Sequence, residues 1–481
     1  MKKILIAFTP LVIIFGGCTK NLTDLNVNPK APPTVPSYTL FTNAEKTLAD
    51  NITTPNVNVG IFELIAQYWQ ETTYTDESRY DLSTRSIPQN WWAALYRDVL
   101  KDFDEAKKLI PTDVSDPDVQ KNQLAIADII EVYTWYILVN TFGDIPYSEA
   151  LDINNPFPKY DDASTIYSDL LSRIDADIAS LNPDATSFDQ ADLIYSGDVS
   201  LWLKFANSFK LKMGMLIADI DPATAKSVVE SAATGVFESN DDNAIFQYLS
   251  APPNTNPIWT NLVQSGRKDF VACTTTIDEM TSVNDPRLPF YFTEDATGGY
   301  SGGEPGVSSN YATFSKPSGP LVVPGSIGKV TNPDFPADLL DYAEVEFLLA
   351  EAVERGMNVG GTAEEHYDNA ITASIEYWGG SAADAATYLS NPAINYKTGT
   401  WKERIGTQEW VALYTRGFDG WTIFRRLRYP ALQAPSTALS EFPVRYTYPV
   451  NEQNLNQTNY DAASAAIGGD VVTTKLWWDV N

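Results

Sequence analysis

Residues 67–92 hold the densest mixture of aromatic and polar side chains in this sequence. Rings alternate there with amides, carboxylates and guanidinium groups. A sugar offers an apolar C–H face to a flat ring and a rim of hydroxyls to polar partners, so this mixture suits a hydroxyl-rich ligand. The segment therefore predicts a ligand-binding cluster made of Trp69, Tyr74, Arg79, Tyr80, Trp91 and Trp92.

A second cluster of the same kind lies farther along, in a part of the chain that is rich in Pro and Gly. There we expect ligand contacts from Trp259, Arg267, Phe270 and Tyr300, and the glycines of 302–306 would let the backbone approach a ligand closely. Packing in the protein core is the alternative for every one of these rings, because aromatic side chains also bury large apolar areas.

The acidic side chains and the single histidine predict no enzyme. His366 stands among acids in a helical segment without a nucleophile elbow, and pairs such as Asp161–Asp162 have no catalytic context. A glycosidase would need two carboxylates roughly 5–10 Å apart across a sugar, which the sequence cannot place. A lipid-anchored carbohydrate-active enzyme is thus the less favoured alternative to a binding protein.

The sequence also indicates no cofactor and no metal ion. It contains no phosphate-binding loop, dinucleotide fingerprint, paired-cysteine motif or His-Glu-x-x-His motif. Loop carboxylates would suit a structural calcium ion, but no spacing specifies one.

The first 17 residues have the pattern of a secretory signal. Two lysines precede twelve mostly apolar residues, Ile4 to Phe15, and two glycines then lead to Cys18. The apolar stretch is shorter than the roughly 20 residues that a membrane-spanning helix needs. Because the cysteine follows directly, the segment resembles a bacterial lipoprotein signal, and we expect lipidation of Cys18. An ordinary signal with a chance cysteine is the alternative.

The composition of the full sequence limits the partners of this protein. The formal net charge is −29, from 62 acidic and 33 basic residues, so phosphate backbones are repelled and we expect no nucleic-acid partner. The other cysteine, Cys273, is interpreted as a small core residue.

The pattern of apolar residues predicts a mostly helical fold with long irregular loops and a few short strands. We expect an extended leader over 18–37 and one domain over 38–481. Within it, 120–142 is apolar nearly all round and predicts an interior helix. Residues 241–335 predict a loop-rich insertion on the ligand face, with short extended runs such as 288–293.

Two later segments predict a pair of packed helices. They cover 337–355 and 363–378, and small alanines mark where the two helices approach each other. Such pairs are typical of tetratricopeptide-type arrays. Near the C-terminus, arginines among aromatic rings predict a locked terminal segment rather than a ligand site; they are Arg425, Arg426, Arg428 and Arg445.

Seven short motifs, in the same order along the chain, resemble those of the SusD/RagB-like family of outer-membrane nutrient-binding lipoproteins. Beyond the cysteine and its Pro-rich leader, they are Phe142-Gly143-Asp144-Ile145-Pro146-Tyr147, the helix from Trp202 to Leu211, Asp285-Pro286-Arg287, the helix from Tyr342 to Ala352, Trp410 to Tyr414 with the following Gly417 to Trp421, and Arg445 to Pro449.

This resemblance implies a scaffold of tetratricopeptide-like helix pairs with irregular loops on one side. It also implies a lipid-anchored (palmitate-bearing) protein of the outer membrane of Bacteroidetes-type bacteria, facing the exterior. Members of the family cap a SusC-type TonB-dependent transporter and pass it a captured oligosaccharide or peptide. We therefore expect non-catalytic capture of nutrient oligosaccharides, with peptides or another nutrient as the alternative.

Overall fold

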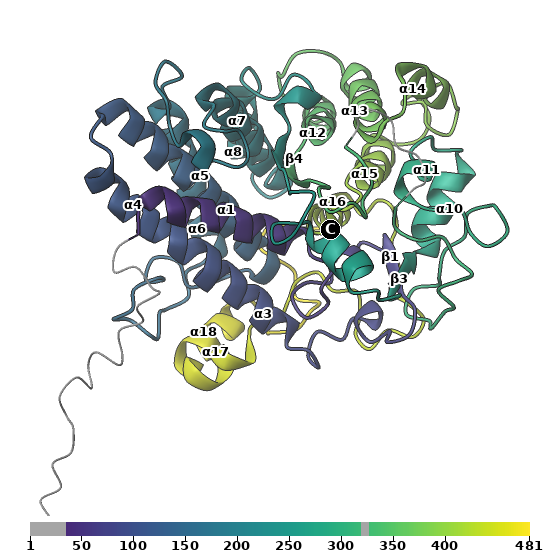
Figure 1. Ribbon diagram of the computed structural model, residues 1–481, viewed down its shortest axis with the longest axis horizontal. Coiled ribbons are helices and arrows are strands. Elements are labelled where there is room, and N and C mark those ends of the chain that lie inside the picture. The colour runs from purple at the N-terminus through teal and green to yellow at the C-terminus, as the bar shows by residue number, and fades with distance from the viewer. Residues whose placement is uncertain (1–34, 319–326) are drawn as a thin grey trace, which may run out of the picture.

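A computed structural model describes residues 35–318 and 327–481 of the chain. The predicted signal, Cys18 and nearly all of the leader lie outside these described residues. Helices make up most of the described structure, and its strands are few and short (Figure 1). The mostly helical fold predicted from the sequence is confirmed.

The N-terminal half is a stack of helices around one buried helix, α5. Nineteen of its residues from Asn122 to Phe142 are buried, so the predicted interior helix is confirmed. Among the described residues α5 alone has the length and composition of a membrane-spanning helix, but 89% of its most apolar window is buried inside the protein. The helical segments of this half are α1 (Ser37–Thr53), α2 (Phe62–Ile65), η2 (Glu77–Arg79), α3 (Ile87–Ala93), the π-helical η3 (Ala94–Leu100), α4 (Lys101–Asp113), α5 (Pro117–Phe142), α6 (Ala163–Ser180), η4 (Asp189–Ala191), α7 (Val199–Leu216), α8 (Pro222–Ala232) and η5 (Asn240–Asp242).

Aspartates begin four of these helices. Asp116, Asp162, Asp198 and Asp221 each accept a hydrogen bond from a backbone N–H of the first turn. The side chain thereby satisfies a donor that has no partner within the helix, and its negative charge meets the positive end of the helix dipole. Part of the acidic composition is therefore used to define where helices start.

The C-terminal half repeats the arrangement of packed helices. Helices α12 and α13 form the predicted pair, and α13 begins with a capping box in which Thr362 and Glu365 bond to each other's backbone N–H. The helical segments of this half are α9 (Pro257–Trp259), the π-helical η6 (Thr260–Gln264), α10 (Thr274–Ser282), α11 (Leu288–Tyr291), α12 (Tyr342–Glu354), α13 (Ala363–Trp378), α14 (Ala382–Leu389), α15 (Trp401–Ala412), α16 (Gly417–Leu427), α17 (Val450–Leu455) and α18 (Gln457–Ala466).

Four short strands form two separate antiparallel pairs. β1 (Trp69–Glu71) pairs with β3 (Phe270–Ala272), and β2 (Ala244–Phe246) pairs with β4 (Ala337–Leu340). Each pair joins segments that are far apart in the sequence. The β1–β3 pair therefore attaches the loop-rich 241–335 region to the helical half (Figure 1).

Two local expectations are wrong. Residues 288–291 form a helical turn, α11, rather than an extended run, because Pro289 stands in the first turn of a helix, where its missing N–H costs nothing. The helix predicted from residue 337 starts only at Tyr342. Asp341 caps it by accepting from the N–H of Glu344, and the four residues before Asp341 pair with β2 instead.

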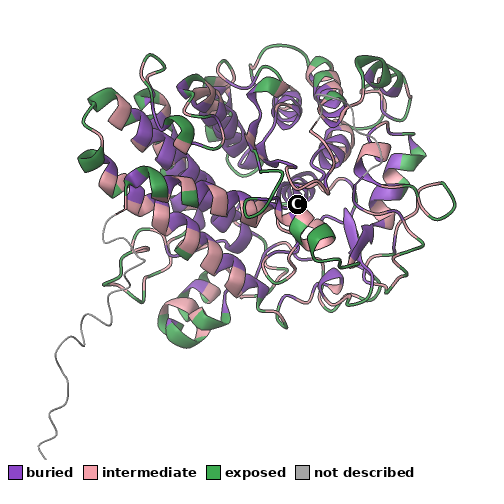
Figure 2. Cartoon of the chain, viewed as in Figure 1, coloured by how far each residue is buried: buried purple, intermediate pink, exposed green. Residues whose placement is uncertain are grey.

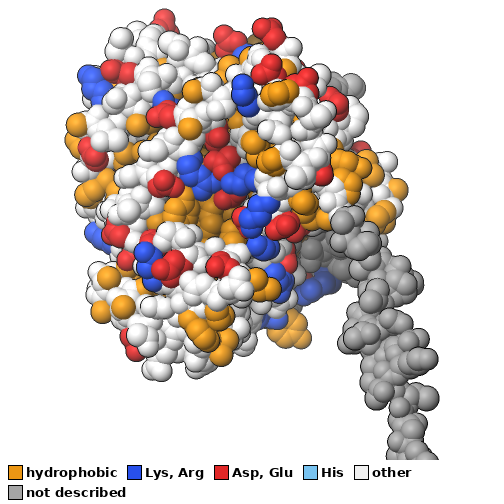
Figure 3. Space-filling view, turned by 90° about the vertical axis from the view of Figure 1, so that its left-hand side faces the viewer, with side chains coloured by type: hydrophobic (Ala, Val, Ile, Leu, Met, Phe, Trp, Pro, Cys, Tyr) orange, Lys and Arg blue, Asp and Glu red, His pale blue; other side chains and the backbone are white. Residues whose placement is uncertain are grey.

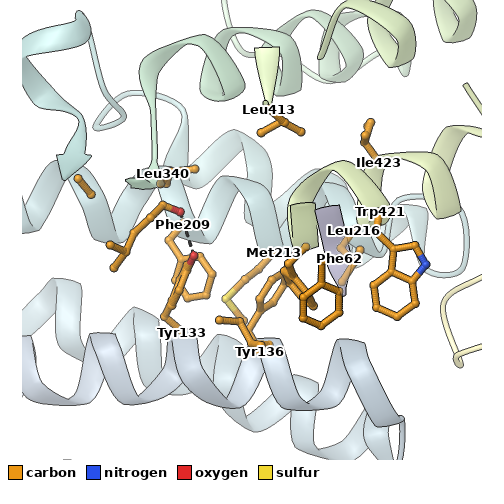
Figure 4. Close-up of a cluster of buried hydrophobic side chains, with 14 of the residues drawn as sticks. Phe62, Tyr133, Tyr136, Phe209, Met213, Leu216, Leu340, Leu413, Trp421 and Ile423 are labelled. Carbon is orange, nitrogen blue, oxygen red and sulfur yellow. Dashed lines mark hydrogen bonds between the residues drawn. The ribbon is translucent and has the colours of Figure 1, made fainter. Parts of the chain in front are cut away.

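The core joins the two halves through large side chains. Figure 2 shows buried residues on the inner sides of the helices and exposed residues on their outer turns. In Figure 4, Phe62, Phe209 and Trp421, from α2, α7 and α16, lie in one cluster of buried side chains. The hydroxyl of Tyr133 donates to the carbonyl of Leu339 at 2.9 Å, which ties α5 to β4.

The predicted lock at the C-terminus is confirmed. The Arg425 guanidinium lies 3.5 Å from the centroid of the Trp421 ring, and its Nη1 donates to the carbonyl of Asn140 at 2.7 Å. Arg445 donates to the carbonyl of Phe142 at 2.9 Å and pairs with Asp470 at 2.6 Å. The end of α5 is thus fastened to the closing segment.

A cluster of paired charges lies inside the protein, between α7, α12 and α16. Lys212 lies 2.6 Å from Asp419 and 2.8 Å from Glu344, and Arg416 lies 2.5 Å from Glu344 and 3.3 Å from Asp341. All five side chains are at least 90% buried. Burial alone would lower the pKa of Lys212, but Asp419 and Glu344 raise it, so the lysine stays charged.

Surface charges are arranged differently. On the face that Figure 3 shows, basic side chains gather near the centre beside acidic and apolar ones. Ion pairs join neighbouring helices: Lys107 of α4 and Arg173 of α6 both pair with Asp128 of α5, at 2.5 and 2.6 Å. These three side chains are 16–24% exposed, so the pairs lie between the surface and the core.

Replacing Lys212 with methionine should strongly destabilise the protein. The variant leaves Glu344 and Asp419 with Arg416 as their remaining cation, and breaking a buried pair costs about 3–5 kcal/mol. Urea denaturation followed by tryptophan fluorescence measures the loss. Lys226→Met is the control, since Lys226 is exposed and lies 3.6 Å from Glu230; an equal loss in both variants would contradict the role given to the cluster.

Candidate functional site

A polar cleft lies where strand β1 meets strand β3. Glu71, at the end of β1, is paired with Phe270, at the start of β3, so both residues reach the same edge. The turn after α1, the loop before α3 and helix η6 complete the walls of this feature, which we call the β1–β3 cleft. The space in it that water-sized molecules can occupy is about 70 Å³. Its lining residues are Pro55, Asn56, Val57, Asn58, Glu71, Thr73, Tyr74, Arg85, Asn261, Arg267, Asp269 and Phe270.

The cleft carries two aromatic rings of different character. Tyr74 is 71% exposed and offers its ring to solvent. Phe270 is 6% exposed and packs against Trp69, with the ring centroids 5.8 Å apart. The ring of Tyr74 can therefore contact a ligand over much of its surface, whereas Phe270 contributes only an apolar edge to the wall of the cleft.

The polar groups of the cleft are held by neighbouring side chains. Arg267 pairs with Asp269 at 2.5 Å, and Arg85 pairs with the buried Glu77. Asn56 accepts from the Asn58 backbone N–H at 3.1 Å and from the Asn58 side chain at 2.8 Å. Amides and ion pairs arranged in this way offer both donors and acceptors to a ligand rich in hydroxyls.

The surroundings of Glu71 in the cleft shift the pKa of its carboxyl group. Its Oε2 accepts from the N–H and the hydroxyl of Ser78, at 2.9 and 3.0 Å. Burial raises the pKa of Glu71 to about 8, with a further contribution from the negative charge of Glu77. At neutral pH this group is mostly protonated and can donate a hydrogen bond.

Three residues predicted from the sequence line this cleft. Tyr74 comes from the first predicted cluster, and Arg267 and Phe270 come from the second. The β1–β3 pair brings parts of the two clusters together, although they are far apart in the chain.

Four other predicted residues lie in the core, as the packing alternative required. Trp91 is fully buried and Trp92 is 7% exposed, packed edge-on against Phe142 at 5.0 Å. Trp69 donates its indole N–H to the hydroxyl of Tyr414 at 3.0 Å. Tyr80 is 2% exposed. These four rings are buried and do not line the cleft.

The remaining predicted residues lie near the surface but outside the cleft lining. Arg79 donates to the carbonyl of Thr437 at 2.8 Å and so holds a C-terminal loop. Trp259, at the end of α9, and Tyr300 are both partly exposed.

Sequence reasoning missed the turn at 55–58 and Arg85. Short polar residues after a helix are typical of any turn, so the sequence holds no signal that could have assigned Asn56 or Asn58 to a site. Among the described residues, no group of three or more His, Cys, Asp or Glu side chains could hold a metal ion.

Comparison with known proteins identifies the fold and the family. A family model described as "Starch-binding associating with outer membrane", SusD-like, matches residues 29–449. The chain belongs to the SusD-like family. This family description names binding of a glycan, starch, and association with the outer membrane. It agrees with the prediction that the chain is a binding protein and not an enzyme. No curated protein matches the sequence.

Several solved structures share the SusD-like fold. A chitin-binding protein is 27% identical, with a TM-score of 0.79 over 92% of this chain and 100% of its own. A SusD homologue from Bacteroides uniformis is 26% identical, with a TM-score of 0.75 over 92% of this chain and 99% of its own. A chitin-binding SusD homologue from Flavobacterium johnsoniae, 24% identical, has a TM-score of 0.78 over 92% and 98% of the two chains and shows the fold alone.

Replacing Glu71 with glutamine should remove a pH dependence of stability. In the unfolded chain this group ionises near its ordinary pKa of 4.5, whereas the folded protein keeps it protonated up to about pH 8. Stability therefore falls as pH rises between these values and levels off above the higher one. The melting temperature of Glu71→Gln should accordingly rise relative to wild type from about pH 5 to about pH 8.

Glu304→Gln is the control for this measurement, because Glu304 is exposed on a loop outside the cleft. A difference between wild type and Glu71→Gln that stays constant over this pH range would show that Glu71 is not protonated in the folded protein.

Proposed function

We propose that this SusD-like protein captures nutrient oligosaccharides in the β1–β3 cleft, without cleaving them, and delivers them to a SusC-type TonB-dependent transporter. The observation that carries the proposal is the lining of the cleft. An exposed ring, Tyr74, stands there beside Arg267, Asp269 and a set of amides. The 27% identical chitin-binding protein supports a glycan as the ligand class.

The cleft suits binding rather than turnover. Its two acidic side chains, Glu71 and Asp269, are engaged with Ser78 and Arg267. Recognition of this kind needs no cofactor. A peptide is the competing ligand class, since rings and amides bind peptide backbones as well, and binding experiments that include peptides decide between the two.

The predicted lipoprotein signal at the N-terminus supports a location for this protein. We propose that Cys18 is lipidated after removal of residues 1–17, that the leader up to residue 37 extends from the anchor, and that the domain faces the cell exterior. A strongly acidic domain gains nothing from an anionic membrane surface, so a covalent lipid is what would hold it there.

Removing the Tyr74 ring should weaken glycan binding. Loss of one aromatic contact of about 1–1.5 kcal/mol predicts a dissociation constant about 5- to 12-fold higher for Tyr74→Ala. Isothermal titration calorimetry with chitin and maltose oligosaccharides, and with an unrelated hexapeptide, measures the effect. Tyr38→Ala is the control, because Tyr38 is 52% exposed on α1 and outside the cleft. Unchanged glycan affinity in Tyr74→Ala would exclude the cleft as the binding site.

Replacing Cys18 should release the protein from the membrane. Cys18→Ala removes the only thiol next to the signal, so labelled palmitate should no longer be incorporated and the protein should appear in the soluble fraction. Cys273→Ala is the matched control, since the only other cysteine is buried in the core. Palmitate labelling that persists in Cys18→Ala would refute the anchor.

A further inference from the structure

A second pocket borders the β1–β3 cleft. The two share Arg267, Asp269 and Phe270 as a common wall, so a ligand in one lies next to the other. The space in this second pocket that water-sized molecules can occupy is about 440 Å³, and its other walls include Tyr311, Lys316 and Lys329. We call it the lysine pocket.

The charge of the lysine pocket is opposite to that of the protein. It is lined by three cations, Arg267, Lys316 and Lys329, and by one carboxylate, Asp269, which pairs with Arg267 at 2.5 Å. Among the described residues, no carboxylate lies within 4.0 Å of the ammonium group of either lysine. Glu294 follows the wall residue Thr293 but is exposed and does not line the pocket. In a chain of net charge −29, this local excess of positive charge on the described walls of the pocket suits an anion.

Two hydrogen bonds join Lys316 to Thr293 on the wall of the pocket. Lys316 donates its N–H to the hydroxyl of Thr293 at 3.1 Å, and its carbonyl accepts from the N–H of Thr293 at 3.0 Å. Its ammonium group lies 5.3 Å from the centroid of the Tyr311 ring. An aromatic platform with a cation beside it can contact a sugar ring and a charged substituent of that ring together.

The β1–β3 cleft lacks this excess of positive charge. Its guanidinium groups, Arg85 and Arg267, are each paired with a carboxylate. The cleft therefore suits the neutral hydroxyl-bearing part of a ligand, and the lysine pocket suits an oxyanion on the same ligand.

We propose that the lysine pocket binds an anionic substituent, a carboxylate or a sulfate ester, of the glycan whose neutral part occupies the β1–β3 cleft. The ligand class is thus an acidic oligosaccharide rather than a neutral one. This inference rests on the proposed glycan-binding function and narrows its substrate. The overall negative charge of the protein disfavours long polyanions, so the pocket selects a locally placed charge.

A matched pair of ligands tests the proposal. One is an α-1,4-linked galacturonic acid tetrasaccharide, and the other is the same tetrasaccharide with its carboxyl groups reduced to alcohols. A sulfated galactan tetrasaccharide distinguishes sulfate from carboxylate. Affinities are measured by calorimetry for the whole mature domain, for Lys316→Gln and for Lys329→Gln. Lys402→Gln is the control, because Lys402 also stands over a ring, Trp401 at 5.6 Å, but outside both pockets.

We expect at least one acidic ligand to bind more tightly than the reduced tetrasaccharide. Each pocket variant should weaken that binding by about tenfold or more, as loss of one charge-assisted contact predicts. Lys402→Gln should match wild type, and raising salt should weaken acidic but not neutral binding.

The outcomes separate this inference from the proposed function. If the reduced tetrasaccharide or other neutral glycans bind as tightly as the acidic ones, the lysine pocket has no ligand role and the proposed function stands. If no glycan binds at all, both fall. If an acidic hexapeptide binds with the same dependence on Lys316 and Lys329 and no glycan does, the ligand is a peptide and the glycan class is refuted.

Discussion

The requirement that buried charges be paired is the constraint on which this structure most depends. Lys212 on α7 and Arg416 before α16 face Glu344, Asp419 and Asp341 inside the protein. An unpaired charge at that depth would cost several kcal/mol, so α7, α12 and α16 must meet in one arrangement. A second buried pair, Arg287 with Asp285 at 2.6 Å, fixes the turn before α11 in the same way.

This arrangement extends to the candidate site through a few contacts. The N–H of Gly417, at the start of α16, donates to Glu63 at 2.8 Å, shortly before β1. A Cβ at position 417 would lie 2.5 Å from the backbone nitrogen of Glu63, so the approach requires glycine. The hydroxyl of Tyr68 then donates to the carbonyl of Trp410 at 2.5 Å. These contacts hold strand β1, and with it one wall of the cleft, against helices α15 and α16.

The charges of the protein serve different purposes at different depths. Aspartates at the surface start helices and keep the domain acidic, whereas three cations and one carboxylate line the lysine pocket. The aromatic side chains also have different roles in the core and near the surface. Most stabilise the core, and a few, such as Tyr74 and Tyr311, stand beside polar groups near the surface. A rigid frame with a small, chemically distinct binding region suits capture of a ligand that is passed on unchanged.

The sequence by itself determined the helical class, the buried helix α5, the packed pair α12–α13 and the family. These follow from the spacing of apolar residues, from helix caps and from short motifs, all of which are local in the chain. The motifs mark structural contacts, such as Arg445 with the carbonyl of Phe142, so they identify the scaffold and carry little information on the ligand.

Only the tertiary structure decided which aromatic residues could meet a ligand. Trp91 and Tyr74 are equally suited by type, but one lies in the core and the other is exposed. The cleft exists because β1 pairs with β3 and because the 55–58 turn folds against both, and pairing between distant segments leaves no periodic signal in a single sequence. Helix formation depends on residues that are close together in the sequence. The exposure of a side chain and the charge around it depend on which distant segments pack over that side chain.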